Sequence, residues 1–188
     1  MTSLDTDAAT ILRSLDQADA FVAVFDRHYD AVRRYVGRRV GIPEADEITS
    51  ETFAVAFRRR SSYDRTHPNA RPWLFGIATN LLRRHTRSER RRLSAFARSA
   101  LPSHGLDPRI AAAGQRGELL AALSSLPRPD AEALLLFALA DLSYAEIARA
   151  LQIPEGTVAS RIARARTRMR AALSPGTPLT TNPLEEGT

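Results

Sequence analysis

Apolar residues recur every three or four positions along most of the chain, and this spacing is the strongest constraint on its fold. The first regular series consists of Phe21, Phe25, Tyr29, Val32, Val36 and Val40. Such steps place the residues on one face of an α-helix, and Gly41 and Pro43 mark the end of that helix. The alternating pattern that indicates a β-strand is absent throughout. We therefore expect an all-α fold.

The helical segments form two groups, separated by a stretch that has little periodicity. In the first group, a second helix is expected over residues 43–60 and a long one over about 72–92, with a turn-rich loop between them. We expect two small helical domains joined by a flexible linker, and the expected boundaries are a leader at 1–17, a helical bundle at 18–95, the linker at 96–117, a helix-turn-helix domain at 118–173 and a disordered tail at 174–188.

Several classes of protein are excluded by residues that the chain lacks. It has no cysteine, which excludes disulfides and thiolate metal sites, and its four histidines are too scattered to share a metal-ligand spacing. We find no paired carboxylates in a plausible site, no Ser/His/Asp arrangement and no phosphate-binding loop, so we expect neither an enzyme nor a cofactor. No apolar run reaches the ~20 residues that span a bilayer, and the first residues do not form a signal peptide. We expect a cytoplasmic protein.

The positive charge is concentrated in two short blocks. Residues 65–98 carry nine arginines and one acid, Glu89. Residues 149–170 carry six arginines and one acid, Glu155. A chain that needed only solubility would intersperse its charges, whereas concentrated arginine favours a polyanionic partner, most often a nucleic acid.

The C-terminal basic block has the pattern of a helix-turn-helix. Ser143 and Glu146 form a capping box that opens a first helix, and Pro154 starts a second one. Projection of the second helix at about 100° per residue places Val158, Ile162 and Ala165 on an apolar stripe. A polar face opposite this stripe can reach base edges and phosphates, and it consists of Thr157, Ser160, Arg161, Arg164 and Arg168.

The middle basic block places the chain's one tryptophan on a basic face. The same projection puts the apolar residues of this helix on one arc, while the opposite face carries Trp73, Asn80, Arg83, Arg84, Arg87 and Arg91. A lone tryptophan is usually a core anchor. Beside a basic groove, however, aromatic rings stack on unpaired bases, and asparagine can bond a base edge. We therefore predict that Trp73 and Asn80 contact unpaired bases.

With these motifs, the chain resembles the extracytoplasmic-function sigma factors of bacterial RNA polymerase. The stretches FDRHYDAVRRYVGRRV, PEADEITSETFAVAF, RPWLFGIATNLLRRHTR and LSYAEIARALQIPEGTVASRIARARTRMR occur in the family's order. The resemblance implies a protein that binds core polymerase, recognises the −10 element through sigma domain two and the −35 element through sigma domain four, and promotes strand opening. It also implies a monomer when free, with promoter DNA as a partner and an anti-sigma factor as a candidate partner.

The resemblance also implies contact surfaces for the polymerase. The clamp helices of the largest subunit would dock on a face that comprises Asp46, Glu47, Ile48, Glu51, Phe53 and Phe57, and domain four would meet the flap of the second subunit. Residues alone favour a plainer interpretation of the three acids as the first turns of a helix. One departure concerns the turn of the helix-turn-helix, where Gln152 replaces the family's usual glycine and must adopt the backbone angle that the turn requires.

Two other functions remain open from the residues. A stand-alone helix-turn-helix regulator would bind an operator without polymerase, but it leaves the middle basic block unexplained. A nucleic-acid-processing enzyme would need a catalytic constellation, which we do not find.

Overall fold

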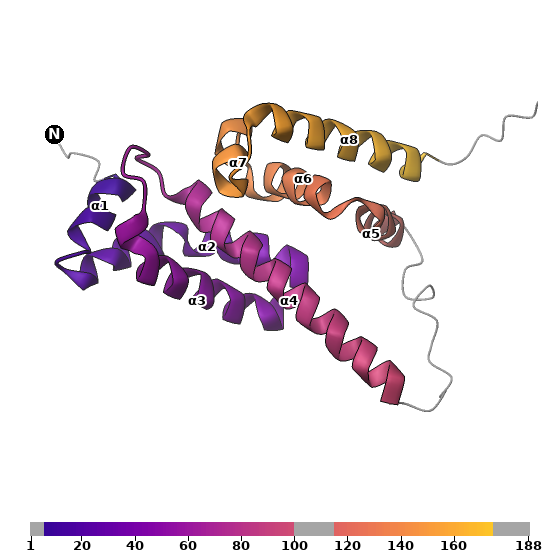
Figure 1. Ribbon diagram of the computed structural model, residues 1–188, viewed down its shortest axis with the longest axis horizontal. Coiled ribbons are helices and arrows are strands. Elements are labelled where there is room, and N and C mark those ends of the chain that lie inside the picture. The colour runs from indigo at the N-terminus through magenta and orange to yellow at the C-terminus, as the bar shows by residue number, and fades with distance from the viewer. Residues whose placement is uncertain (1–5, 100–114, 175–188) are drawn as a thin grey trace, which may run out of the picture.

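The computed structural model describes residues 6–99 and 115–174, and every element within those ranges is a helix (Figure 1). The N-terminal domain (residues 6–99) contains α1 (Asp7–Arg13), η1 (Ala18–Phe21), α2 (Val22–Val40), α3 (Ile42–Arg59), η2 (Arg60–Ser62) and α4 (Arg71–Ser99). The C-terminal domain (residues 115–174) contains α5 (Gln115–Ser125), α6 (Arg128–Ala140), α7 (Tyr144–Leu151) and α8 (Glu155–Leu173). The all-α prediction is confirmed. The expected tail, and the centre of the expected linker, lie outside the described residues.

The core of the N-terminal domain lies between α2, α3 and α4. Tyr35 of α2 is fully buried, its ring meets that of Phe75 edge-on with centroids 5.1 Å apart, and its hydroxyl is 3.0 Å from Thr79 Oγ1. This hydrogen bond satisfies two polar groups that would otherwise be costly to bury. Gly41, with φ of 93°, separates α2 from α3, as the glycine and proline in the sequence predict.

The segment expected to be a leader contains a helix, α1. Thr6 caps it by accepting a hydrogen bond from the Ala9 N–H at 3.2 Å, and Ile11 is buried against the N-terminal domain. A helix this short is not stable by itself, and it is too short to show the periodicity that identified the others. Packing against the rest of the domain therefore stabilises it.

The helix-turn-helix of the C-terminal domain forms as the sequence predicts. The capping box of Ser143 and Glu146 is complete, with each residue's side chain bonded to the other's backbone. Gln152 adopts the left-handed conformation, with φ of 55°, so the turn requires the angle that glycine adopts most readily. Val158 and Ile162 of α8 are fully buried. Among the described helices, none is long and apolar enough to cross a membrane.

Candidate nucleic-acid interface

The loop between α3 and α4 (residues 60–70) is held in shape by its own side chains. The Tyr63 hydroxyl donates to the His67 carbonyl at 2.6 Å, and burial raises the pKa of Tyr63 to about 12. Asp64 accepts hydrogen bonds from the hydroxyl of Thr66 at 2.7 Å and from its backbone N–H at 3.0 Å. These bonds lower the pKa of Asp64 and make the loop a defined surface.

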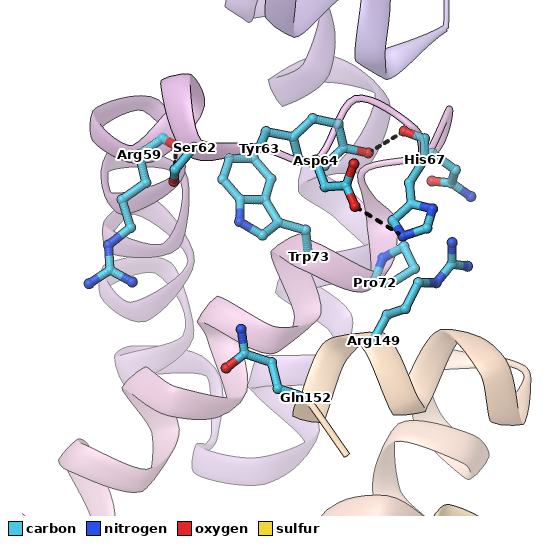
Figure 2. Close-up of a pocket in the computed structure, with 10 residues that line it drawn as sticks. Arg59, Ser62, Tyr63, Asp64, His67, Pro72, Trp73, Arg149 and Gln152 are labelled. Atoms are coloured by element: carbon cyan, nitrogen blue, oxygen red, sulfur yellow. Dashed lines mark hydrogen bonds and ion pairs between the residues drawn. The ribbon is translucent and has the colours of Figure 1, made fainter. Parts of the chain in front are cut away.

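Trp73 lies at the junction of this loop and α4. Its ring centroid is 5.0 Å from that of Tyr63, and Figure 2 shows the two rings next to each other at a hollow. The side chain is half-buried, so one part is anchored while another stays accessible. The hollow has a volume of about 460 Å³ and is lined by Arg59, Ser62, Tyr63, Asp64, His67, Asn69, Pro72, Trp73, Arg149 and Gln152.

The basic face of α4 continues from Trp73 along the helix. Asn80 is exposed, and its Oδ1 accepts a hydrogen bond from Arg83 Nη1 at 3.1 Å. Arg84, Arg87 and Arg91 are exposed further along α4. The structure thus places all six residues predicted for this face on one helix, with Trp73 nearest the loop.

The C-terminal domain packs against the same face of α4. Arg83 donates from Nε to Glu132 Oε1 at 2.7 Å and also bonds Oε2 through Nη2, and this hydrogen bond raises the pKa of Arg83. Glu132 is 2 % exposed, and Arg83 shares it with Arg128 of α6, whose Nε donates to Oε1 at 3.1 Å, so the buried carboxylate has the charged partners that it requires. Near the start of α4, Arg71 donates to the Ala140 carbonyl at 2.5 Å.

At Gly76 the backbones of the two domains approach each other closely. A Cβ atom at this position would lie 2.5 Å from the carbonyl oxygen of Ala150 in α7. Figure 1 shows α7 beside the first turns of α4, and Arg149 and Gln152 from its end complete the hollow at Trp73. Local sequence patterns do not predict this contact, because its partners are far apart in the chain.

The polar face of α8 lies away from this contact. Val158, Ile162 and Ala165 are buried as predicted. Of the residues predicted to face DNA, Thr157 and Arg161 are half-buried and Ser160, Arg164 and Arg168 are exposed.

Two of these arginines share a buried acid that sequence reasoning missed. Arg164 donates to Asp130 of α6 through Nε at 3.2 Å and Nη2 at 3.0 Å, and Arg168 Nη1 lies 3.5 Å from the same carboxylate. The hydrogen bond to Asp130 raises the pKa of Arg164. Asp130 therefore fixes the direction of two side chains on this face, although its position in the sequence indicates only the first turn of a helix.

The residues expected to face polymerase differ in exposure. Asp46, Glu47 and Glu51 are exposed, Phe57 is half-buried, and Ile48 and Phe53 are buried in the core. Asp46 accepts a hydrogen bond from Arg33 Nε at 2.5 Å, which lowers the pKa of Asp46. Ile48 and Phe53 can thus support this surface from beneath but offer little area to a partner.

An apolar groove of about 500 Å³ lies near this surface, between η1, α2 and α3. Phe53 and Phe57 form one wall, and the opposite wall contains Val22 and Phe25, which are 56 % and 36 % exposed. Exposed aromatic and aliphatic side chains in a groove are typical of an interaction surface. Sequence reasoning placed Phe25 in the core stripe of its helix, and only the packing shows that its ring reaches the surface.

The part of the chain that the structure describes contains no group of three or more histidine and acidic residues arranged to hold a metal ion. The groups on α4 and α8 that can contact a nucleic acid are arginine, asparagine and hydroxyl side chains, together with the half-buried Trp73.

Comparison with known proteins identifies both domains. Residues 24–92 match the family described as Sigma-70 region 2, and residues 116–169 match the family described as Sigma-70, region 4. The ECF RNA polymerase sigma factor SigC of Mycobacterium tuberculosis is 32% identical over 179 residues, which cover 93% of this chain and 96% of that protein. SigM of Bacillus subtilis, also an ECF RNA polymerase sigma factor, is 29% identical over 70% of this chain and 81% of its own length.

The fold also resembles a solved structure. CnrH in complex with the cytosolic domain of CnrY superposes with a TM-score of 0.62 at 24% identity, covering 89% of this chain and 96% of that one. At this identity, the likeness supports the helical fold.

Proposed function

The chain belongs to the extracytoplasmic-function family of RNA polymerase sigma factors. On that basis we propose which of its residues contact the −10 element, the −35 element and the polymerase. As a sigma factor it directs transcription initiation by RNA polymerase and is not itself an enzyme. The alternative of a stand-alone regulator accounts for α7 and α8 but leaves the region 2 domain without a role.

The N-terminal domain recognises and opens the −10 element. The observation that carries this assignment is the half-buried Trp73 ring, which lies against Tyr63 on the wall that the N-terminal domain contributes to the hollow and so stays in place when the C-terminal domain leaves. A base that leaves the duplex can stack on the Trp73 ring, and such stacking contributes ~1–3 kcal/mol per base. This offsets the few kcal/mol that unstacking costs, so the hollow favours the open strand.

The rest of α4 holds the DNA backbone. Asn80 can bond a base edge, while Arg83, Arg84, Arg87 and Arg91 supply positive charge along the strand. The electrostatic part of this binding weakens as salt rises, whereas the stacking at Trp73 does not depend on charge.

The C-terminal domain reads the −35 element with α8. In a helix-turn-helix the second helix enters the major groove, and here Thr157, Ser160 and Arg161 lie near the start of that helix. Arg161 can bond a guanine through two hydrogen bonds. Arg164 and Arg168, both directed by Asp130, contact bases or phosphates further along the groove.

The surfaces for protein partners lie elsewhere. Asp46, Glu47 and Glu51 face the clamp helices of the polymerase's largest subunit, with Phe57 contributing beside the apolar groove. The C-terminal domain meets the flap of the second subunit. The sigma factor RpoE of Bartonella quintana was solved in complex with the anti-sigma factor NepR, and by analogy an anti-sigma factor is a partner of this chain. Its place of action is the cytoplasm, where the polymerase is.

This function requires the two domains to separate. The C-terminal domain covers Gly76 and engages Arg83, both on the α4 face that would receive the −10 strand. DNA and the C-terminal domain thus compete for that face, while α8 stays accessible. Core polymerase binds each domain at a site distant from this contact. The free energy of that binding offsets the cost of separating the domains.

The experiment that tests the −10 assignment is Trp73→Ala in the complete chain bound to core polymerase. We expect the variant to reduce strand opening, measured by permanganate reactivity of unpaired thymines, by about 5- to 150-fold, the equivalent of ~1–3 kcal/mol. Duplex binding should change much less. Arg161→Ala is the counterpart and should impair −35 discrimination instead. Equal loss of opening and duplex binding in Trp73→Ala would show that the ring only packs.

A further inference from the structure

Asp7 is a buried acid in α1 that neither the sequence motifs nor the proposed function explains. Its side chain is 4 % exposed. Oδ1 accepts a hydrogen bond from Arg27 Nη1. Oδ2 lies 2.7 Å from His28 Nε2 and accepts a hydrogen bond from the Ala70 backbone N–H at 2.8 Å. The carboxylate thus joins α1 to α2 and to the residue that precedes α4.

The contact with Ala70 places Asp7 at the end of the α3–α4 loop. Ala70 accepts the hydrogen bond from Leu74 N–H that belongs to the first turn of α4, and Trp73 lies within that turn. Fixing the Ala70 N–H therefore fixes where α4 starts and, with it, the direction from which Trp73 enters the hollow.

Residues of α1 and its C-cap hold the loop at both ends. The Ser14 carbonyl, at the C-cap of α1, accepts a hydrogen bond from Arg60 Nε at 3.2 Å, where the loop begins. The Ala8 N–H donates to the Pro68 carbonyl at 3.4 Å, near where the loop ends. The loop between these points contributes Tyr63, Asp64 and His67 to the hollow.

Docking of α1 alone does not require a buried charge. Ile11 is 1 % exposed and supplies apolar area of the kind that holds a helix on a domain. A buried carboxylate costs free energy unless donors surround it, and Asp7 has its donors on two separate elements. Burial raises the pKa of Asp7, but hydrogen bonds from His28 and the Ala70 N–H outweigh that effect, so the pKa is lowered and the group stays charged.

We propose that Asp7 is a positioning residue for the −10 element, which sets the α3–α4 loop and Trp73 for the capture of an unpaired base. This inference rests on the proposed function of the hollow. It adds that α1, a segment with no DNA-facing residue of its own in that proposal, determines how well the hollow works. Asp7 acts through Ala70 and does not touch the DNA.

The test compares Asp7→Ala and Asp7→Asn with a matched control on the same helix, Leu12→Ala, whose side chain is 45 % exposed. Each complete chain is assembled with core polymerase, and three quantities are measured: core affinity, binding of duplex −35 DNA, and permanganate reactivity at the −10 element. Asp7→Asn retains the shape and one acceptor, so it keeps the test valid if Asp7→Ala does not fold.

We expect Asp7→Ala to reduce permanganate reactivity about tenfold and Asp7→Asn by a smaller factor, with core affinity and −35 binding within twofold of the unaltered chain. Leu12→Ala should leave all three unchanged. Parallel loss of all three quantities would mean that Asp7 only holds the fold together and would overturn the inference. If strand opening is unchanged in both Asp7 variants but impaired in Trp73→Ala, the inference about Asp7 is wrong and the proposed function stands. If Trp73→Ala has no effect on opening, the proposed function itself is wrong.

Discussion

Gly76→Ala separates the two domains without altering any residue that we assign to DNA. The added methyl carbon would lie 2.5 Å from the Ala150 carbonyl oxygen, 3.3 Å from its carbon and 3.4 Å from its Cα. These are backbone atoms of α7, which cannot turn aside as a flexible side chain could. The C-terminal domain must therefore move off α4 for the substitution to be accommodated.

The size of the effect follows from two opposing contributions. Alanine is favoured over glycine in a helix interior by ~1 kcal/mol, but α4 is helical whether or not the domains touch, so this gain stabilises both states. Overpacking a close contact costs ~1–3 kcal/mol, and only the closed state bears that cost. The ratio of closed to open molecules should therefore fall by about 5- to 150-fold.

Fluorescence energy transfer across the two domains measures this ratio. Because the chain has no cysteine, dyes can be attached to cysteines introduced at Ser50 of α3 and Thr167 of α8, both exposed. Gly37→Ala is the matched control, since its Cβ would meet only Ala45 Cβ, at an ordinary 3.5 Å. We expect lower transfer in free Gly76→Ala and unchanged transfer in Gly37→Ala. Transfer in Gly76→Ala equal to that of the unaltered chain would mean that the contact at Ala150 does not hold the domains together.

Two further predictions concern stability. Gln152→Gly should raise the urea midpoint, because a non-glycine residue in the left-handed conformation costs ~1–2 kcal/mol and Gln152 has φ of 55°; an unchanged or lower midpoint would contradict this. Because the folded-state pKa of Asp7 is lowered, its contribution is fully present at neutral pH and is lost as pH falls through that lowered value. The melting temperature of Asp7→Asn should accordingly lie below that of the unaltered chain at pH 7, and this difference should narrow in acid. A difference that widens in acid would contradict a lowered pKa for Asp7.

The sequence predicts the elements of this fold better than their contacts. Periodicity and the capping box at Ser143 identify the helix-turn-helix, since these signals lie within one or two turns of chain. The pairing of Arg83 with Glu132 leaves no such trace, because each residue by itself resembles a charge on a helix surface. The identity of the partner depends on how the domains pack.

In the candidate site, too, the faces of the helices could be predicted from the sequence but the contacts between elements could not. Projection placed Trp73 on the basic face of α4, and the structure places it at a hollow, half-buried beside Tyr63. The buried acids that direct the arginines, Asp130 among them, could not be distinguished from ordinary first-turn acids. Asp7 was missed for a further reason, since α1 has only seven residues and depends on tertiary packing.

Run-off transcription with purified core polymerase shows whether the chain directs initiation through Trp73. The chain is added to core enzyme on a library of genomic promoter fragments, with core alone and the Trp73→Ala variant in parallel. We expect transcripts from a defined subset of fragments that share −10 and −35 elements, and a marked reduction of those transcripts with Trp73→Ala. Transcription no more promoter-specific than that of core alone would contradict this expectation.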